Sequence, residues 1–167
     1  MRTAANARGA IVFSNGSEMK INASSHFTVE EEDKVKRESK VRLHKGQTYS
    51  RSAGVRAKVS IRTPVAVVSV RGTEFDTKVD EGGDTDILVV DGAITVSNDF
   101  GSVDVKQGQT TSVAGGQAPQ PPKDMTITEM TQATDWQKGI KIERKKLKIK
   151  YKTDDGKEGT LNLKFGK

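Results

Sequence analysis

The sequence is poor in the residue types that build disulfides, metal sites and membrane spans. Its 167 residues include no cysteine, two histidines and one tryptophan, and 5% are aromatic. Without thiols, neither a disulfide framework nor a thiolate metal site can form. No apolar run approaches the roughly 18 residues of a membrane helix, and the residues after Met1 do not resemble a secretory signal. If the protein is exported, we expect its signal to lie outside this numbering.

Constellations that carry out catalysis are also missing. His26 and His44 lie in separate alternating segments, which is typical of ordinary sheet or surface residues. The acidic residues around Gly82-Gly83 lack the alternating acidic positions and the terminal glutamate of an EF-hand, so a hairpin loop is favoured there. The sequence has no phosphate-binding glycine loop and no nucleophile elbow. We therefore predict no enzymatic activity, no cofactor, and no catalytic or metal-binding residues.

Composition and spacing favour β structure. Hydrophobic residues make up 33% of the chain and charged residues 30%, which predicts the thin core of sheets that bury one face. Asn15-Gly16 supplies the positive φ angles of a two-residue hairpin turn. Short apolar alternations recur between such turns, at 10–13, 19–21, 27–29, 41–43, 55–61, 65–70, 74–79, 86–90, 93–96 and 103–105. The pattern predicts an all-β fold, either an antiparallel β-sandwich or a short β-solenoid.

Two pairs of segments resemble each other. Residues 9–15 (GAIVFSN) are similar to 92–98 (GAITVSN), and 45–50 (KGQTYS) to 107–112 (QGQTTS). A duplication that produced pseudo-repeated hairpins and convergent hairpin chemistry would both give this similarity. Residues 30–40 are almost continuously charged, which predicts a solvated loop or edge ribbon, with a partner-specific site as the alternative.

The amino-acid composition of the chain changes after Val113. Three of the four prolines lie within 119–122, which predicts a semi-rigid linker at 118–126 after a β domain at 1–117. The remaining residues, 127–167, are expected to form an appendage. It begins with a short helix over 128–137, ended by Gly139 and anchored to the body by Trp136. A β-hairpin follows, with a turn at 154–156.

The basic charge of the protein belongs to this appendage. The whole chain has a net charge of +6, and residues 138–167 hold eleven Lys and Arg against four Asp and Glu. In the hairpin, apolar residues alternate with lysines, and an isolated two-stranded ribbon is marginal in water. We therefore expect its apolar face to dock on the body, another subunit or a partner. The predicted partner-binding residues are Lys146, Lys148, Lys150, Tyr151, Lys152, Leu161, Leu163 and Phe165.

The segment 61–75 (IRTPVAVVSVRGTEF), followed by alternating segments on either side of Gly92, resembles the FecR domain family. That family has a Thr-Pro, an alternating strand, Arg-Gly-Thr-x-Phe and a downstream glycine. Asn15-Gly16-Ser17 stands where the family has an Asp-Gly-Ser turn, and the resemblance spans roughly residues 3–117. The family's opening strands are not found before Thr3, so we expect the numbering to begin inside a domain. The motif residues are Thr63, Pro64, Arg71, Gly72, Thr73, Phe75 and Gly92.

The residue types in this motif predict structural roles. Pro64 suits the first residue of a strand, where a missing donor does no harm. Val65, Val67 and Val70 are expected to face the core with Phe75.

The alternation of apolar and polar residues shifts by one position around Ser69 and Arg71, which indicates a bulge or bend near Gly72. Arg71 is expected to bind backbone carbonyls or a carboxylate such as Glu74 or Asp91, and an exposed Arg71 that contacts a partner is the alternative.

The resemblance implies a domain outside the cytoplasm. FecR-type regulators pass signals from outer-membrane receptors through a membrane helix to a cytoplasmic sigma factor, and other FecR-like domains occur alone in exported proteins. Because the sequence shows no such helix, we predict a structural accessory subunit of a periplasmic or extracellular assembly, such as a flagellar filament. Its partners would be other envelope or filament proteins or further copies of the chain, joined by strand addition.

Two alternative functions stay open. One is the periplasmic sensor domain of a FecR-type regulator. The other is polyanion binding through the basic tail, without sequence-specific recognition of nucleic acid, because lysine dominates and few aromatic side chains could stack on bases.

Overall fold

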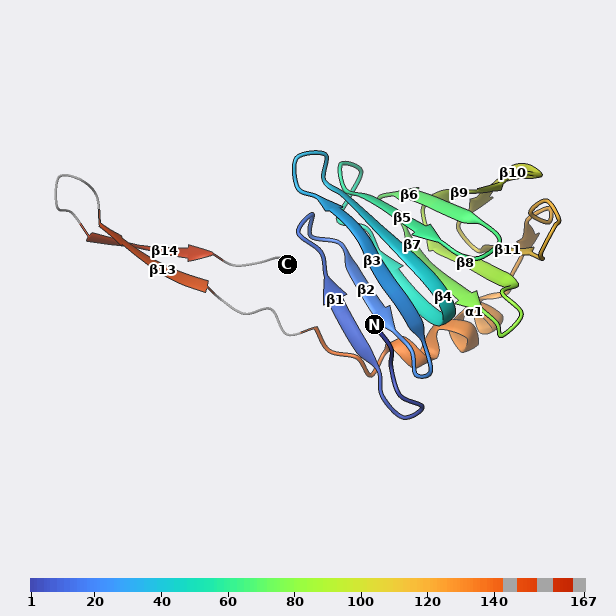
Figure 1. The fold of residues 1–167 in the computed structure, drawn as a ribbon, viewed down its shortest axis with the longest axis horizontal. Helices are drawn as coiled ribbons and strands as arrows, with labels where there is room; N and C mark the ends of the chain where they lie inside the picture. The colour runs from blue at the N-terminus through green and yellow to red at the C-terminus, as the bar shows by residue number, and fades with distance from the viewer. Residues whose placement is uncertain (143–146, 153–157, 164–167) are drawn as a thin grey trace.

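We describe the fold from a computed structural model that covers residues 1–142, 147–152 and 158–163, with the backbone alone considered at Arg71 and in the last two stretches. Strands dominate it (Figure 1). None of the helices in these residues is long and apolar enough to cross a membrane. The body contains β1 (Gly9–Val12), β2 (Glu18–Ile21), β3 (His26–Asp33), β4 (Glu38–Arg51), β5 (Lys58–Arg62), β6 (Val67–Arg71), β7 (Glu74–Val79), β8 (Thr85–Asp91), β9 (Ala93–Asn98), β10 (Gly101–Lys106), β11 (Gln109–Val113) and β12 (Lys123–Asp124). After it come α1 (Ile127–Thr134), the 3₁₀ turn η1 (Asp135–Gln137), β13 (Leu147–Lys152) and β14 (Glu158–Leu163).

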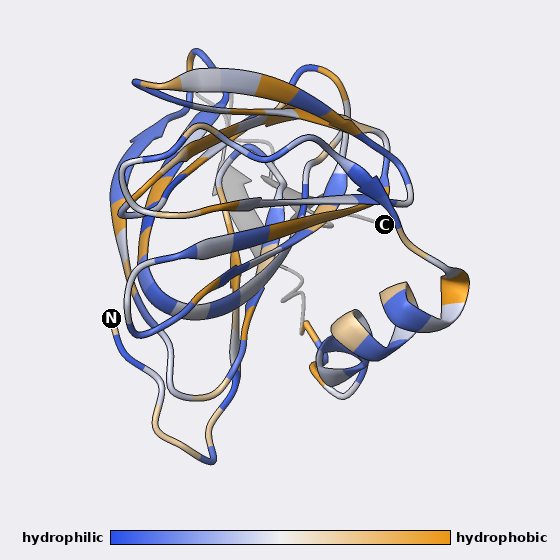
Figure 2. Cartoon of the chain, turned by 90° about the vertical axis from the view of Figure 1, so that its right-hand side faces the viewer, coloured by the Kyte–Doolittle hydropathy of each residue, from blue (hydrophilic) through white to orange (hydrophobic). Residues whose placement is uncertain are grey.

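Twelve strands form one sheet that curls into two layers (Figures 1 and 2). Layer A contains β3, the first part of β4, β5, β6, β9 and β10. Layer B contains β1, β2, the second part of β4, β7, β8, β11 and β12. The all-β class is therefore confirmed, and β4 is the strand that the two layers share.

β4 passes from layer A to layer B at Gly46. Residues up to Lys45 pair with β3, and residues from Gly46 onward pair with β7. Gly46 has φ +99°, and a Cβ built on it would lie 2.5 Å from the Cα of Ser25. Only glycine fits both the backbone conformation and this close approach.

The bend in β4 explains one departure from the predicted antiparallel pairing. The chain leaves β4 in layer B, and its next strand, β5, returns to layer A, where Lys58 pairs with Glu38 at the start of β4. Both strands therefore run in the same direction, and the β4–β5 pair is parallel. The sheet is mixed for this reason.

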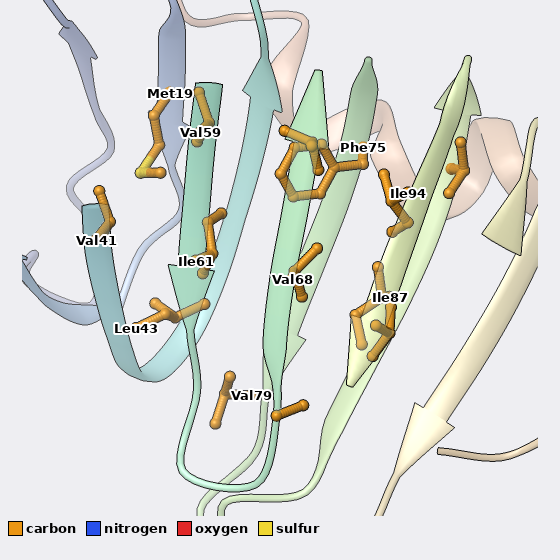
Figure 3. Packing of buried hydrophobic residues seen from close by; sticks show 14 of the residues in the cluster. Met19, Val41, Leu43, Val59, Ile61, Val68, Phe75, Val79, Ile87 and Ile94 are labelled. Carbon is orange, nitrogen blue, oxygen red and sulfur yellow. The ribbon is translucent and has the colours of Figure 1, made fainter. Parts of the chain in front are cut away.

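The core lies between the two layers (Figure 3). Side chains alternate along each strand, so that valine and isoleucine point inward while serine and threonine point outward on β5, β6 and β9. Fully buried residues include Met19, Phe27, Leu43, Ile61, Val68, Phe75, Ile87, Val96, Val105 and Val113.

The prediction for the central strand was right in part. Val70 and Phe75 are buried and the partly buried Val65 packs against the core, whereas Val67 is partly exposed and Ala66 and Val68 face inward in its place. The alternation runs unbroken through Ser69, and the predicted bend is present at Gly72, which has φ +68°. The register of β7 against β8 also shifts, between Glu74 and Phe75.

The hairpins predicted as copies occupy different layers. β1 pairs with β2 in layer B, and β9 pairs with β10 in layer A. The chain then enters β11 through Gly108, which has a positive φ like Gly46. The similar segments therefore have similar backbone conformations, but they lie in different layers of the sheet.

The segment after the prolines packs on the body. β12 pairs with Gln109 and Thr110 of β11, and α1 with η1 lies beside layer B (Figure 2). Thr126 caps α1 in a capping box with Glu129. The predicted helix is thus present, one residue earlier at its start. The division of the chain at residue 117 stays a prediction.

β13 and β14 form a separate antiparallel sheet of two strands. Leu147 pairs with Leu163, and Ile149 with Leu161, as the predicted hairpin requires. The turn expected at 154–156 lies outside the described residues.

Candidate interaction surfaces

The Thr-Pro of the hallmark motif forms the turn between β5 and β6. The Thr63 hydroxyl accepts hydrogen bonds from the Ala66 amide at 3.0 Å and from the Thr85 hydroxyl, also at 3.0 Å. Thr85 belongs to layer B, so this buried pair of hydroxyls joins the layers. Pro64 lies in the turn, where a Cβ on Gly83 would meet its ring at 3.2 Å. The prediction that Pro64 begins a strand was wrong, because the turn delays β6 to Val67.

The Arg-Gly-Thr-x-Phe segment joins the layers at the opposite end. Gly72, with φ +68°, leads from β6 into β7, and Gly92, with φ +85°, leads from β8 into β9. A Cβ on Gly92 would lie 3.2 Å from the Gly72 carbonyl oxygen. The buried Thr73 donates to the Ala93 carbonyl at 3.1 Å, and Phe75 is fully buried. These residues therefore hold the two crossings together.

The predicted role of Arg71 concerns a side chain outside the described part of the structure. One of its expected partners is already engaged, because Glu74 pairs with Arg51 at 2.6 Å and accepts from the Tyr49 hydroxyl at 2.7 Å.

A groove of about 670 Å³ crosses the outer face of layer A. The register places Ser60, Ser69 and Thr95 side by side on three neighbouring strands. Asp104 ends this row and accepts a hydrogen bond from the Thr95 hydroxyl at 2.8 Å. These small side chains therefore line the base of the groove with hydroxyl groups, which we call the hydroxyl floor.

Charged side chains line the ends of this groove, which we call the layer A groove. They are Lys58, Lys106, Glu38 and Asp104. Neither lysine takes part in an ion pair among the described residues. A ligand with carboxylates and hydrogen-bonding groups would suit such a surface.

Part of the outer face of layer B is covered instead. Asp76 and Leu88 pair with each other on neighbouring strands and are each about 5% exposed or less, and η1 reaches Asp76 through Trp136. The Asp76 carboxylate accepts from Gln47 Nε2 at 2.9 Å and from Trp136 Nε1 at 3.3 Å. The prediction that Trp136 anchors the helix is thus confirmed.

Further polar contacts hold the same segment. Gln47 Nε2 also donates to the Ala133 carbonyl at 3.3 Å, and Lys20 donates to the side chain and the carbonyl of Gln137. Burial, offset in part by the Gln47 and Trp136 hydrogen bonds, raises the pKa of Asp76 to about 7. The sequence gives no sign of this, since Asp76 lies sixty positions from Trp136.

The two histidines meet on the surface of β3 and β4. The ring centroids of His26 and His44 are 4.4 Å apart, and Thr28 Oγ1 lies 3.1 Å from His44 Nε2. Partial desolvation and the nearby charges of Arg2 and His44 lower the pKa of His26. Within the described residues, no three His, Cys, Asp or Glu side chains cluster as a metal site.

The charged run at 30–40 forms the exposed ends of β3 and β4. Glu30 pairs with Arg42 at 2.6 Å and Glu31 with Lys40 at 2.7 Å, both across the two strands. This agrees with the edge ribbon predicted from the sequence, because β4 is the only named strand that pairs with β3, and the short bridge from Arg2 reaches only the start of β3 at His26.

The side chains of the predicted partner-binding residues of the tail lie outside the described part of the structure. Lys148, Lys150, Tyr151 and Lys152 lie on β13, and Leu161 and Leu163 on β14, where the backbone alone is described. Lys146 and Phe165 lie outside the described residues. Their role stays a prediction.

Two solved structures share this fold. Both are crystal structures of a proposed anti-sigma factor from Parabacteroides distasonis ATCC 8503, each with a TM-score of 0.70 and 16% sequence identity. The similarity covers 83% and 87% of this chain, and 64% and 68% of those chains. This chain therefore spans about two thirds of their length, and at such identity the likeness concerns the fold alone. A comparison with curated proteins gives no match.

The family model described as FecR protein matches residues 1–95. This stretch is more than half of the chain, and it contains the turn at Thr63-Pro64 and both glycine crossings at Gly72 and Gly92. The chain therefore belongs to the FecR protein family.

Proposed function

We propose that this chain is the contact domain of a FecR-type regulatory protein, placed outside the cytoplasm, and that it acts by binding another protein rather than by catalysis. Family membership over residues 1–95 is the observation that carries this proposal. The likeness to a proposed anti-sigma factor supports a regulatory role. It favours the sensor alternative over the filament subunit, for which the comparisons offer no support.

The layer A groove is the contact surface we propose. Around Asp76 the outer face of layer B is covered by η1, whereas the layer A groove is open on the outer face of β5, β6 and β9. Lys58 and Lys106 are available for carboxylates, and the hydroxyl floor offers hydrogen bonds to a polypeptide backbone. The expected partner is a periplasmic extension of an outer-membrane receptor, as the family resemblance implies.

The test measures binding of the chain to purified periplasmic extensions of outer-membrane receptors from the same organism. Ser69→Arg fills the layer A groove and is expected to weaken binding at least tenfold. Ser112→Arg places the same side chain at an exposed position on layer B and should leave binding unchanged. Absence of binding by the unaltered chain would contradict the proposed function, whereas equal effects of the two variants would contradict the surface.

A second comparison separates the sensor from the scaffold. A sensor domain should bind the receptor extension as well without residues 140–167 as with them. A filament subunit that docks through its tail should lose its association with an envelope assembly on the same truncation.

A further inference from the structure

The segment α1–η1 is held to the body around a carboxyl group that has no cation beside it. Asp76 on β7 is 4% exposed, and both of its hydrogen-bond donors, Gln47 and Trp136, are neutral. Hydrogen bonds recover part of the hydration that a buried carboxylate loses, but no cation forms an ion pair with Asp76 in the described residues to compensate the rest. The charged form of Asp76 is therefore costly at this joint.

The ionisable groups of the neighbouring elements do not supply that charge. Lys78, two residues along β7, acts on Asp76 through space but is exposed and forms no ion pair with it in the described residues. Lys20 donates to Gln137, and Arg51 pairs with Glu74. The remaining groups on the strands and helices that pack here are Glu18, Tyr49, Asp86, Glu129, Asp135 and Lys138, of which Asp135 and Lys138 pair with each other.

The protonation of Asp76 is linked to docking of the segment. While α1–η1 covers it, burial raises the pKa of Asp76 to about 7, from an ordinary value of 3.8. When the segment leaves, Asp76 stands on the outer face of a strand in water, where the ordinary value applies. The docked form therefore binds a proton more tightly, so docking is strongest at acid pH and weakens as the pH rises from about 4 to about 7.

We propose that Asp76, Gln47 and Trp136 form a pH-responsive clasp, which holds the C-terminal segment on layer B more firmly when the carboxyl group carries a proton. The clasp does not depend on the proposed partner, because every group in it belongs to this chain. At neutral and alkaline pH, the segment after Thr126 is then held less firmly on layer B.

The size of the effect follows from the difference in proton affinity. Values of about 7 and 3.8 imply that the docking equilibrium constant falls by up to roughly 1,000-fold between acid and alkaline pH. The contacts of Lys20 with Gln137 and of Gln47 with the Ala133 carbonyl do not involve Asp76 and remain at all pH values. The clasp therefore loosens rather than disappears.

The chain contains its own reporter, because Trp136 is the only tryptophan in the sequence. Acrylamide quenching of its fluorescence in the full chain, between pH 4 and pH 9, measures how often the indole is reachable. We expect quenching to increase as the pH rises, with circular dichroism showing that the β body stays folded throughout.

Three variants test whether Asp76 causes the change in quenching with pH. Asp76→Asn should remove the pH dependence, while Asp104→Asn, a change to an exposed carboxylate on layer A, should preserve it. Gln47→Ala removes a donor that stabilises the charged form of Asp76, so the midpoint should move to higher pH. This third variant keeps the test decisive if Asp76→Asn proves to dock poorly at every pH.

Several results would overturn the clasp. They are quenching that does not change with pH, quenching that falls as the pH rises, and a transition that persists unchanged in Asp76→Asn. A midpoint that stays in place in Gln47→Ala would also count against it.

Discussion

Replacing Gly46 by alanine should destabilise the protein far more than a glycine-to-alanine change usually does. The new Cβ would lie 2.3 Å from Ser25 Oγ and 2.5 Å from Ser25 Cα, while carbon atoms in contact are separated by about 3.5–4.0 Å. The backbone of Ser25 has to move, and its hydroxyl then loses the hydrogen bond it accepts from the Gln47 amide at 3.1 Å.

Two separate costs add up. A side chain at φ +99° costs about 1–3 kcal/mol, and forcing an extra carbon into a filled space costs about 1–3 kcal/mol more. The sum is a large part of the roughly 5–15 kcal/mol that stabilises a domain of this kind. Gly108→Ala is the matched control, because Gly108 has φ +77° and an added Cβ there would meet no atom of the described residues within 4 Å.

Urea denaturation followed by circular dichroism gives the free energy of unfolding of each variant. We expect a loss of about 3–5 kcal/mol for Gly46→Ala and about 1–2 kcal/mol for Gly108→Ala. Equal losses would refute the idea that the close approach of Ser25, in addition to the positive φ, restricts position 46 to glycine.

Further predictions concern buried hydroxyls and the tail. Thr63→Val should cost about 1–3 kcal/mol of unfolding free energy, because it leaves the Ala66 amide without its acceptor. Thr77→Val should be neutral or stabilising by up to about 1 kcal/mol, since the buried Thr77 hydroxyl has no hydrogen-bond partner among the described residues, and a clear loss in thermal denaturation would contradict this. If the basic tail binds polyanions, heparin binding by the full chain should fall steeply between about 50 and 200 mM salt, and a chain ending at Gln137 should not bind; binding insensitive to salt would argue against it.

Local features were predictable from the sequence where the chemistry is local. Asn15-Gly16 lies in the turn between β1 and β2, as the residue pair indicates, and Gly16 has φ +88°. The predicted two-residue turn was wrong, because Asn15 has no positive φ and the Phe13 amide donates to the Ser17 carbonyl, which closes a longer loop over residues 14–16. The capping box at Thr126 and Glu129 starts α1, and the hallmark motif locates the crossings between the layers.

Features that depend on distant parts of the chain were not predictable. The alternation of buried and partly exposed side chains in β4 ends at Leu43, and residues 44–47 are all partly exposed. A polar stretch of this kind is equally typical of a loop, so the sequence does not show that one strand continues into the other layer. Asp76 stands between inward-facing neighbours, and its burial depends on a helix sixty residues away. The choice between Val67 and Val68 as core residues was ambiguous because both are apolar, and the sheet register decided it.

The double membership of β4 has a consequence for how the protein can respond to a signal. A strand shared by both halves makes them one cooperative unit, since neither half can unfold without removing the central strand of the other. Amide hydrogen exchange should then protect β4 to the same level on both sides of Gly46. A conformational change that transmits a signal should therefore move the whole body, or the α1–η1 segment attached to it, and should not separate layer A from layer B.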